Sequence, residues 1–458
     1  MVRAILGSRT NLYLSVGIAD LLAFTTGIWL AWSSPILEKL SSIGDDNPLD
    51  EPITSTQQSW IGSLLTLGAA LCPFFYAFVQ DKFGRKYALL LVAVPYTTAF
   101  LIAAFAKHVA LFIALRFISG ISVAGLFTVL PTYIAEISDA PVRGMLGSTI
   151  NNFLCSGLVV SYVIGAYLPI MWFNLVSAVF PIVFFVLFFM LAPDTPYYLI
   201  GKNRDKAEQA LSFLRSKPVN ELQAELKEIE QTVEESKANA ASFLDIFKSK
   251  GTIKALIISV LLCVFQQLSG INVVLFYAQT IFEASGISMS SEIPPIIIGA
   301  MQFISSFVSP VLVDRLGRKI LLLGSAVGMA VAEIVLGVYF YLKDDGVDVG
   351  SINFLPILTL VIYIISYNCG FGPLPWTVMA ELFSSNIKSA ASSFTVFCCW
   401  FMSFLITFFF DSISAEIGMG GSFWLFSGCT VIAFVFTLVY VPETKGKSFQ
   451  EIQAILNS

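Results

Sequence analysis

Long apolar runs separated by short polar segments dominate this chain of 458 residues. A helix needs about 20 residues to cross a bilayer, and twelve apolar segments reach that length. Gly and Pro interrupt them without the alternation of barrel strands, so we predict helices. The expected spans are residues 11–34, 57–80, 87–106, 109–135, 145–168, 171–192, 253–283, 293–313, 320–342, 352–382, 389–411 and 420–441.

One long segment between the sixth and seventh spans is polar. Within it Leu222, Leu226 and Ile229 recur at helical spacing among glutamates, which predicts amphipathic helices in a segment too short for an enzyme domain. We expect an all-α membrane protein with twelve transmembrane helices in two six-helix bundles. The expected parts are an N-terminal bundle (1–201), a cytoplasmic helical linker (202–252), a C-terminal bundle (253–441) and a cytoplasmic tail (442–458).

Composition and the placement of charge support this interpretation. Hydrophobic residues make up 56% of the chain and charged residues 12%, against about 25% charged residues in soluble domains. Of 26 Lys and Arg residues, only Lys39, Lys107 and Lys343 fall in the other loops and Arg116 falls inside a span, so 22 share one side. The positive-inside rule then predicts cytoplasmic termini and linker. We expect a plasma-membrane protein whose first span is an uncleaved start signal.

Two cytoplasmic turns repeat each other. DKFGRK at 81–86 and DRLGRK at 314–319 share four of six letters, and they follow the second and eighth spans. A second repeated pattern follows each motif: Glu136 precedes Arg143 by seven residues, and Glu381 precedes Lys388 by seven residues. The chain is therefore interpreted as an internal duplication of six spans.

Three carboxamides, those of Gln266, Gln267 and Asn272, lie in the apolar seventh span. An unpaired amide in such surroundings costs about 1 to 3 kcal/mol, so each needs a helix partner or a wet cavity. On a straight helix Gln267 and Asn272 would diverge by about 140°. A break at 269–270 would let them converge, as in the discontinuous helices of secondary transporters. We predict that these uncharged groups bind a polyhydroxyl solute.

Other polar residues in the spans leave alternatives open. Asp20 is a candidate for a functional carboxylate, or a buried partner of Arg116 or of helix backbone. Arg116 is either functional or a snorkelling side chain at the interface, and the nearby glycines at 120 and 125 indicate a close helix contact. Asn151 and Asn152 either line a cavity opposite Gln266 or bridge helices.

The tenth span contains GFGPLPW at 370–376. Pro373 and Pro375 remove backbone donors and are expected to break the helix into a hinge. Trp376 then offers an aromatic face for the C–H side of a sugar ring, or serves in packing.

The sequence offers no enzyme, metal or cofactor site. The single histidine is His108, and there is no Cys/His cluster. Residues 446–448 resemble the end of a phosphate loop, but Val441 stands where that motif needs glycine. We expect a small-molecule sugar substrate and the lipid bilayer as partners, and neither nucleotide nor nucleic acid.

Seven motifs together resemble the sugar porter family of the major facilitator superfamily over essentially the whole chain, most closely insect facilitated trehalose or hexose transporters. They are DKFGRK, PTYIAEISDAPVRG at 131–144, PDTP at 193–196, QQLSGIN at 266–272, DRLGRK, GPLPW at 372–376 and PETKG at 442–446. The resemblance implies the major facilitator fold.

The resemblance also implies which residues contact the sugar. Four positions depart from the family pattern, namely Asn151, Gln302, Asn368 and Cys399, where Gln, Asn, an acid and Asn are usual. The sugar's size and stereochemistry therefore stay open. The implied sugar-binding residues are Asn151, Gln266, Gln267, Asn272, Gln302, Asn368, Trp376 and Trp400.

A cytoplasmic charge network is likewise implied, which holds the bundles together when the inner gate is shut. Lys388 replaces the usual Arg and Tyr197 replaces another. Because lysine lacks the bidentate fork of arginine, we predict a looser outward-facing state. The network comprises Asp81, Arg85, Glu136 and Arg143 in one half and Asp314, Arg318, Glu381 and Lys388 in the other. The full set of expected gating residues adds Arg116, Tyr277, Pro373 and Pro375.

These observations predict a uniporter for a hexose such as glucose, or for trehalose, that works by alternating access. Family members that couple to protons carry an acid in the middle of the first span, and residues 27–29 have none. Proton symport remains an alternative because Asp20 lies about two turns earlier. Two further alternatives are a sugar sensor that does not transport, and a porter for a polyol or organic acid.

Overall fold

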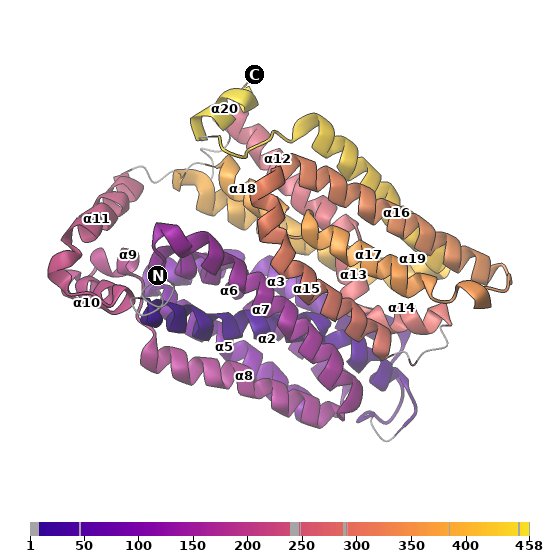
Figure 1. Cartoon of the computed structure of the whole chain (residues 1–458). Coiled ribbons are helices and arrows are strands. Elements are labelled where there is room, and N and C mark those ends of the chain that lie inside the picture. The colour runs from indigo at the N-terminus through magenta and orange to yellow at the C-terminus, as the bar shows by residue number, and fades with distance from the viewer. Residues whose placement is uncertain are drawn as a thin grey trace.

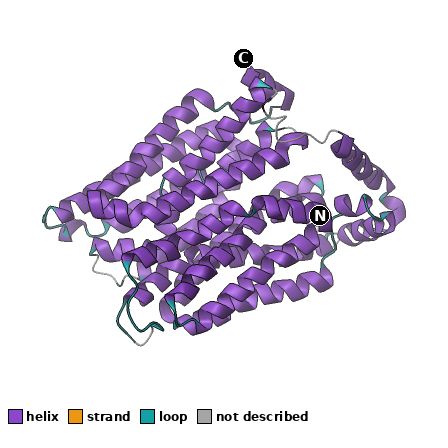
Figure 2. Cartoon of the chain, turned by 180° about the vertical axis from the view of Figure 1, so that it is seen from behind, coloured by secondary structure: helices purple, strands orange, loops and turns teal. Residues whose placement is uncertain are grey.

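The structure is a computed structural model in which residues 9–44, 47–238, 247, 249–286, 290, 292–383, 385–447 and 449–457 are described. Throughout this part the regular elements are helices (Figures 1 and 2). Among the described residues, ten helices are long and apolar enough to cross a membrane, or eleven when one bent pair counts as a span. One of the ten, α19 (Ser385–Tyr440), contains two helices divided at Gly418. The prediction of an all-α membrane protein is confirmed.

The first half contains the helices from α2 to α8. Its second predicted span is two helices that meet at an angle of 45°, because Pro73 brings no backbone N–H to the turn at Cys72. The members are α2 (Thr10–Ser41), α3 (Ser55–Leu71), α4 (Pro73–Phe83), α5 (Arg85–Phe105), α6 (Val109–Ile137), α7 (Ala140–Tyr167) and α8 (Ile170–Leu191).

The predicted end of the first span near residue 34 is wrong, since α2 continues to Ser41 with Pro35 inside it. Membrane helices tolerate an internal proline when neighbouring helices accommodate it. Here Gly165 of α7 leaves the room, because a Cβ at that position would lie 2.5 Å from Cγ of Pro35.

The second half contains the helices from α12 to α19, and two of its predicted spans are broken. The seventh span consists of three helices and the tenth of two. The members besides α19 are α12 (Lys250–Leu268), α13 (Ile271–Phe276), α14 (Ala278–Ser285), α15 (Ile293–Leu316), α16 (Arg318–Asp344), α17 (Leu355–Cys369) and α18 (Leu374–Leu382). The two halves lie side by side (Figure 1), with α2 against α13 and α14, α3 against α19, and α7 against α15.

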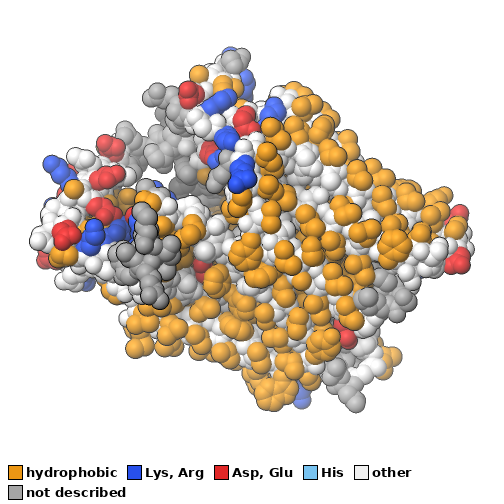
Figure 3. All heavy atoms as spheres, in the orientation of Figure 1, with side chains coloured by type: hydrophobic (Ala, Val, Ile, Leu, Met, Phe, Trp, Pro, Cys, Tyr) orange, Lys and Arg blue, Asp and Glu red, His pale blue; other side chains and the backbone are white. Residues whose placement is uncertain are grey.

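Four short helices lie at one end of the spans, toward the left and top of Figure 1. They are α9 (Pro196–Ile200), α10 (Arg204–Arg215), α11 (Gln223–Ala238) and α20 (Phe449–Asn457). We call this end the linker side and the opposite end, where α2 stops and α3 begins, the far side. Leu211, Leu222, Leu226 and Ile229 form a small core of their own, which confirms the amphipathic pattern. Figure 3 shows charged side chains gathered on the linker side, beside a broad hydrophobic surface.

The repeated motifs form matching turns on the linker side. Gly84 separates α4 from α5 with φ 99°, and Gly317 separates α15 from α16 with φ 88°. Only glycine reaches such angles without steric cost. The predicted tight turns are therefore confirmed.

Candidate functional site

The break in the seventh span brings the predicted amides together. Helix α12 ends at Leu268, and Gly270 takes the left-handed conformation at φ 78° before α13 begins. As a result Nδ2 of Asn272 donates to Oε1 of Gln267 at 2.7 Å. The predicted break and the predicted convergence are both confirmed.

The amide chain continues to the second broken span. Nε2 of Gln267 lies 3.3 Å from Oε1 of Gln266, and Nε2 of Gln266 donates to the carbonyl oxygens of Phe371 and Gly372 at 2.6 and 2.8 Å. Pro375 has no N–H to offer the Phe371 carbonyl four residues earlier. The Gln266 amide takes that place, so the two breaks are joined by a side chain.

Helix α19 completes the surroundings of the amide chain. Nδ2 of Asn272 also donates to Oγ of Ser403 at 2.7 Å, and Nε2 of Gln267 lies 3.2 Å from Sγ of Cys399. Gln267 and Asn272 are 5% and 7% exposed. In this state the three amides thus form hydrogen bonds with one another and with other groups of the second half.

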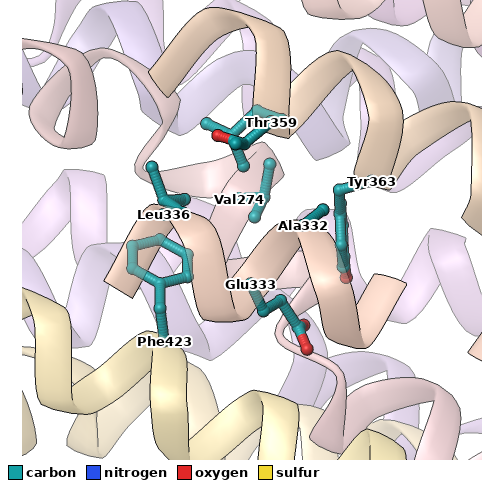
Figure 4. A pocket seen from close by; sticks show the side chains of 8 residues that line it. Val274, Ala332, Glu333, Leu336, Thr359, Tyr363 and Phe423 are labelled. Carbon is teal, nitrogen blue, oxygen red and sulfur yellow. The ribbon is translucent and has the colours of Figure 1, made fainter. Parts of the chain in front are cut away.

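A tyrosine that sequence reasoning missed holds the break from behind. The hydroxyl of Tyr363 donates to the carbonyl of Ser269 at 2.7 Å. Next to Tyr363 is a narrow void, too small for a water molecule, which Glu333 also borders (Figure 4). Oε2 of Glu333 accepts from Oγ1 of Thr430 at 3.2 Å. No local pattern marks Tyr363, because its partner is a backbone carbonyl 94 residues away.

Gln302 and Asn368 form a second polar group, between α15 and α17. Nδ2 of Asn368 donates to Oγ of Ser305 at 2.8 Å and to the carbonyl of Gln302 at 3.2 Å. Oε1 of Gln302 is buried and has no hydrogen-bond partner in the described part of the chain. Since buried polar atoms are nearly always paired, this oxygen is available to a ligand donor.

The two tryptophans reach across to the first half. The rings of Trp376 and Trp400 lie 6.1 and 5.6 Å from the ring of Phe127 on α6. Nε1 of Trp400 is buried and unpaired among the described residues, so it is a free donor. On the first half, Oδ1 of Asn151 lies 3.9 Å from Sγ of Cys155, and no described hydrogen bond links Asn151 to the amide chain.

The far side is closed by hydrogen bonds between the halves. The hydroxyl of Tyr162 on α7 donates to the carbonyl of Leu275 at 2.9 Å, and Oγ of Ser59 on α3 donates to Oδ2 of Asp411 at 2.9 Å. Next to them the fully buried Tyr277 donates to the carbonyl of Thr407 at 3.1 Å. The Tyr162 bond holds α13 against the first half, and the backbone N–H of Gln279, which donates to Oγ of Ser34 at 3.1 Å, holds α14 there.

Arg116 lies in the core of the first half. Its guanidinium is fully buried and donates to the carbonyls of Trp29, Ile61 and Gly62 at 2.8, 2.8 and 3.3 Å. The planar guanidinium holds its N–H donors in a fixed geometry, so it can donate hydrogen bonds to three carbonyls at once. Both pairing with Asp20 and snorkelling are therefore wrong for Arg116.

Asp20 has a different partner. One of its carboxylate oxygens accepts from the hydroxyl of Thr149 on α7. The other, Oδ1, is buried and has no partner among the described residues. The carboxylate is thus placed between α2 and α7 in the first half.

Each half carries one charge cluster on the linker side. The Arg85 cluster contains Arg85, Glu136, Asp194 and Thr195. Nη2 of Arg85 lies 2.9 Å from Oε1 of Glu136, and Oγ1 of Thr195 donates to Oε2 of Glu136 at 2.6 Å. Oδ1 of Asp194 accepts from the backbone N–H groups of Arg85 and Lys86 at 3.1 and 3.2 Å. The carboxylate of Asp194 therefore caps the start of α5.

The Arg318 cluster repeats this arrangement with Arg318, Glu381, Glu443 and Thr444. Nη2 of Arg318 lies 2.7 Å from Oε1 of Glu381, and Thr444 donates to the other oxygen. Glu443 accepts from the backbone N–H groups of Arg318 and Lys319, both at 3.0 Å. Sequence reasoning missed Asp194, Thr195, Glu443 and Thr444, although the shared letters Pro-acid-Thr in PDTP and PETK were a signal.

The two capping carboxylates differ in acidity. Burial raises the pKa of Asp194, although hydrogen bonds from the backbone of Thr195, Lys86 and Arg85 oppose the rise. Burial also disfavours ionised Glu443, but hydrogen bonds from four backbone amides outweigh it and lower the pKa. The difference follows from depth, since Asp194 is 8% exposed while Glu443 is only half-buried.

Each cluster stays within one half in this structure. Asp81 lies 3.7 Å from Arg85 at the surface, and Arg143 donates to the carbonyl of Ser138. The side chains of Asp314 and Lys388 lie outside the described part. A network that joins the bundles when the linker side is shut stays a prediction.

The fold consists of two helical halves with matching charge clusters, and uncharged polar side chains lie at the two broken spans of the second half. These features define a membrane carrier of the major facilitator class. The fold of a proton:xylose symporter XylE bound to 6-bromo-6-deoxy-D-glucose matches with a TM-score of 0.78 and 23% identity, over 98% of this chain and 100% of that one. The inward-open xylose transporter XylE from E. coli matches with a TM-score of 0.80 and 22% identity, over 97% and 99%.

Residues 22–456 match the family described as "Sugar (and other) transporter", and the chain belongs to this transporter family and is not an enzyme. It is 35% identical over 443 residues to the facilitated trehalose transporter Tret1 of Anopheles gambiae and 38% identical over 411 residues to that of Bombyx mori. These alignments cover 96% and 89% of this chain. The chain spans 55% of the Anopheles relative's length and 80% of the Bombyx relative's.

Proposed function

We propose that this chain is a facilitative sugar transporter, a uniporter of a hexose such as glucose or of trehalose, that works by alternating access. In this proposal the linker side is cytoplasmic, both termini are cytoplasmic, and the protein resides in the plasma membrane. The observation that carries the proposal is the amide chain of Gln266, Gln267 and Asn272 at the meeting point of two broken spans. The relatives' names support the choice of substrates.

The geometry supports a mechanism in which sugar hydroxyls replace the contacts that the amides now make with each other. A hydroxyl is both donor and acceptor, so one sugar hydroxyl can be inserted between Gln267 and Asn272, while other hydroxyls pair with the unpaired Oε1 of Gln302 and Nε1 of Trp400. Helices α13 and α14 are separated from α12 by Gly270. They can therefore tilt away from α2 and α7 and open the far side while α12 stays in place.

The proposal is tested by reconstituting the purified chain in liposomes and measuring the flux of labelled glucose and labelled trehalose. A panel of unlabelled sugars, polyols and organic acids then competes against the tracer that moves. We expect saturable flux in both directions and competition by neutral polyhydroxyl compounds only, since the proposed site offers no cation to an anionic solute. Binding without flux would contradict the proposal and favour a sensor.

A uniporter should be insensitive to the protonation of Asp20. We expect sugar uptake by wild type and by Asp20→Asn to differ less than two-fold and to vary little with external pH, because the carboxylate contacts Thr149 and not the amide chain. Initial uptake rates measured across a series of external pH values check this. A steep stimulation by acid that Asp20→Asn abolishes would establish proton symport instead.

The Arg85 cluster should influence which side is open. Glu136→Gln removes the charge that pairs with Arg85, so we expect it to favour the state open to the cytoplasm, visible as weaker binding of an inhibitor applied from outside. Glu381→Gln should act in the same direction, because it breaks the matching pair with Arg318. Glu208→Gln is the control, since its pair with Arg204 is on the surface and such pairs contribute little. Equal inhibitor binding in all four proteins would contradict the role.

A further inference from the structure

The outer surface of the first half is hollowed near its linker side. The hollow, which we call the α4 groove, holds about 610 Å³, within the range of roughly 300–1,000 Å³ for ligand sites. It lies beside the 45° bend between α3 and α4. Its main lining residues are Phe75, Phe78, Lys82, Phe83, Tyr87 and Tyr198.

The α4 groove faces outward, toward the bilayer. The side chains of Phe75, Phe78, Phe83 and Tyr87 are 50%, 58%, 51% and 57% exposed. The amphipathic ring of Tyr87 is of the kind that favours the membrane interface, and the three phenylalanines add apolar surface beside it. Four exposed rings around one hollow therefore offer a surface for an acyl chain next to the headgroup level.

One cation stands at the rim of the groove. Nζ of Lys82 lies 5.3 Å from the ring centre of Phe78 and 5.4 Å from that of Phe83, so its stem runs along the rings while the ammonium is exposed. Lys82 takes part in none of the ion pairs found among the described residues. An ammonium carries three donors, and these remain available to an anionic group.

We propose that the α4 groove binds an anionic phospholipid of the cytoplasmic leaflet. Its acyl chain lies along Phe75 and Phe78, and its phosphate and acidic headgroup accept hydrogen bonds from Lys82. Apolar rings below a single unpaired cation match the two ends of such a lipid. The leaflet follows from the orientation proposed above, and the binding itself does not depend on which solute is carried.

The internal duplication shows that the groove is not a general consequence of the fold. At the matching positions of the second half, 233 residues on, the aromatic residues 75, 78, 83 and 87 are replaced by Val308, Val311, Leu316 and Ile320. Only the cation is kept, as Arg315. The second half thus presents a basic residue at the same height without aromatic rings, which makes it a built-in control.

The groove shares a wall with the Arg85 cluster. The hydroxyl of Tyr198 donates to the carbonyl of Lys82 at 3.0 Å, and the guanidinium carbon of Arg85 lies 5.9 Å from the Tyr198 ring. A lipid in the groove therefore touches a residue that packs directly on the cluster.

Native mass spectrometry of the purified full chain tests the proposal. The protein is offered phosphatidylserine and phosphatidylcholine with identical acyl chains in equal amounts. We expect the wild type to retain phosphatidylserine preferentially and Lys82→Gln to reduce that retention about five-fold, which corresponds to about 1 kcal/mol per basic residue near an anionic surface. Lys82→Arg should keep it, and Arg315→Gln should leave it unchanged.

Other outcomes would overturn the proposal. Equal retention of the two lipids by the wild type would show that the protein does not prefer anionic lipid. Equal losses of phosphatidylserine in Lys82→Gln and Arg315→Gln would show that the lipid is not bound specifically in the α4 groove. The spectrum could instead show a dimer for the wild type and a monomer for Phe78→Ala. That result would mean that the groove binds a second copy of this protein and not a lipid. Because the readout is lipid retention, its failure is distinct from a failure of the sugar-transport proposal.

Discussion

Valine in place of Gly62 is expected to abolish sugar transport in a protein that still folds. A Cβ at Gly62 on α3 would lie 2.2 Å from the hydroxyl oxygen of Tyr277, which belongs to the other half. Tyr277 cannot easily yield, since it is fully buried and donates to Thr407. Overpacking of this kind costs about 1–3 kcal/mol, which shifts a two-state equilibrium by roughly five- to 150-fold. The strain is relieved when the far side opens, so Gly62→Val should hold the protein open there.

Two measurements check this expectation. Tracer uptake should fall to a small fraction of wild type at equal surface expression, and hydrogen exchange in residues 275–285 should become faster because α13 and α14 lose their contacts. Gly428→Val is the matched control, since a Cβ at that exposed glycine of α19 meets nothing within 4 Å. Wild-type uptake by Gly62→Val would show that the far side does not close in the way seen here.

Gln267→Ala and Asn272→Ala are expected to weaken sugar affinity strongly. Each variant removes a donor and an acceptor that the proposed site offers to the sugar, and both side chains are buried. A sugar hydroxyl left without its partner in a buried site costs about 1–3 kcal/mol, which corresponds to about five- to 150-fold in binding. Because the amides do not support the packing between the halves, the variants should still reach the cell surface.

The concentration dependence of tracer uptake separates affinity from maximal rate, with surface protein quantified in parallel. We expect the half-saturating sugar concentration to rise in both variants. Gln223→Ala provides the control, since Gln223 lies in α11 outside the spans and, within the described part of the chain, donates only to the carbonyl of Val219. Unchanged kinetics in both amide variants would remove these residues from the proposed binding site.

Much of the fold could be predicted because each signal was local. Apolar runs specify spans, the glycines of two repeated turns specify their positive φ angles, and three amides in one apolar span required a break at Gly270. The last prediction rested on the free-energy cost of an unpaired amide in apolar surroundings. Polar side chains that cannot face lipid must form hydrogen bonds with one another. The hydrogen bond between Gln267 and Asn272 meets that requirement.

Interactions with backbone carbonyls could not be predicted in this way. Arg116 suggested a carboxylate partner, yet it donates to three carbonyls from α2 and α3. Tyr363 likewise donates to the carbonyl of Ser269. The first span was expected to end at residue 34, but Gly165 leaves room for the helix to continue through Pro35. Every residue has a carbonyl, so no side-chain pattern tells which one a distant donor will reach.

The sequence by itself determined that this chain is a duplicated, all-helical membrane protein with uncharged polar groups in its broken spans. Those properties follow from hydropathy and backbone chemistry, which act within a few residues. Only the tertiary structure decided that the far side is closed, that each charge cluster stays within its own half, and that Gly62 lies against Tyr277. These features depend on how two halves of similar sequence are docked, and docking is set by side chains hundreds of residues apart that meet only after the helices have packed.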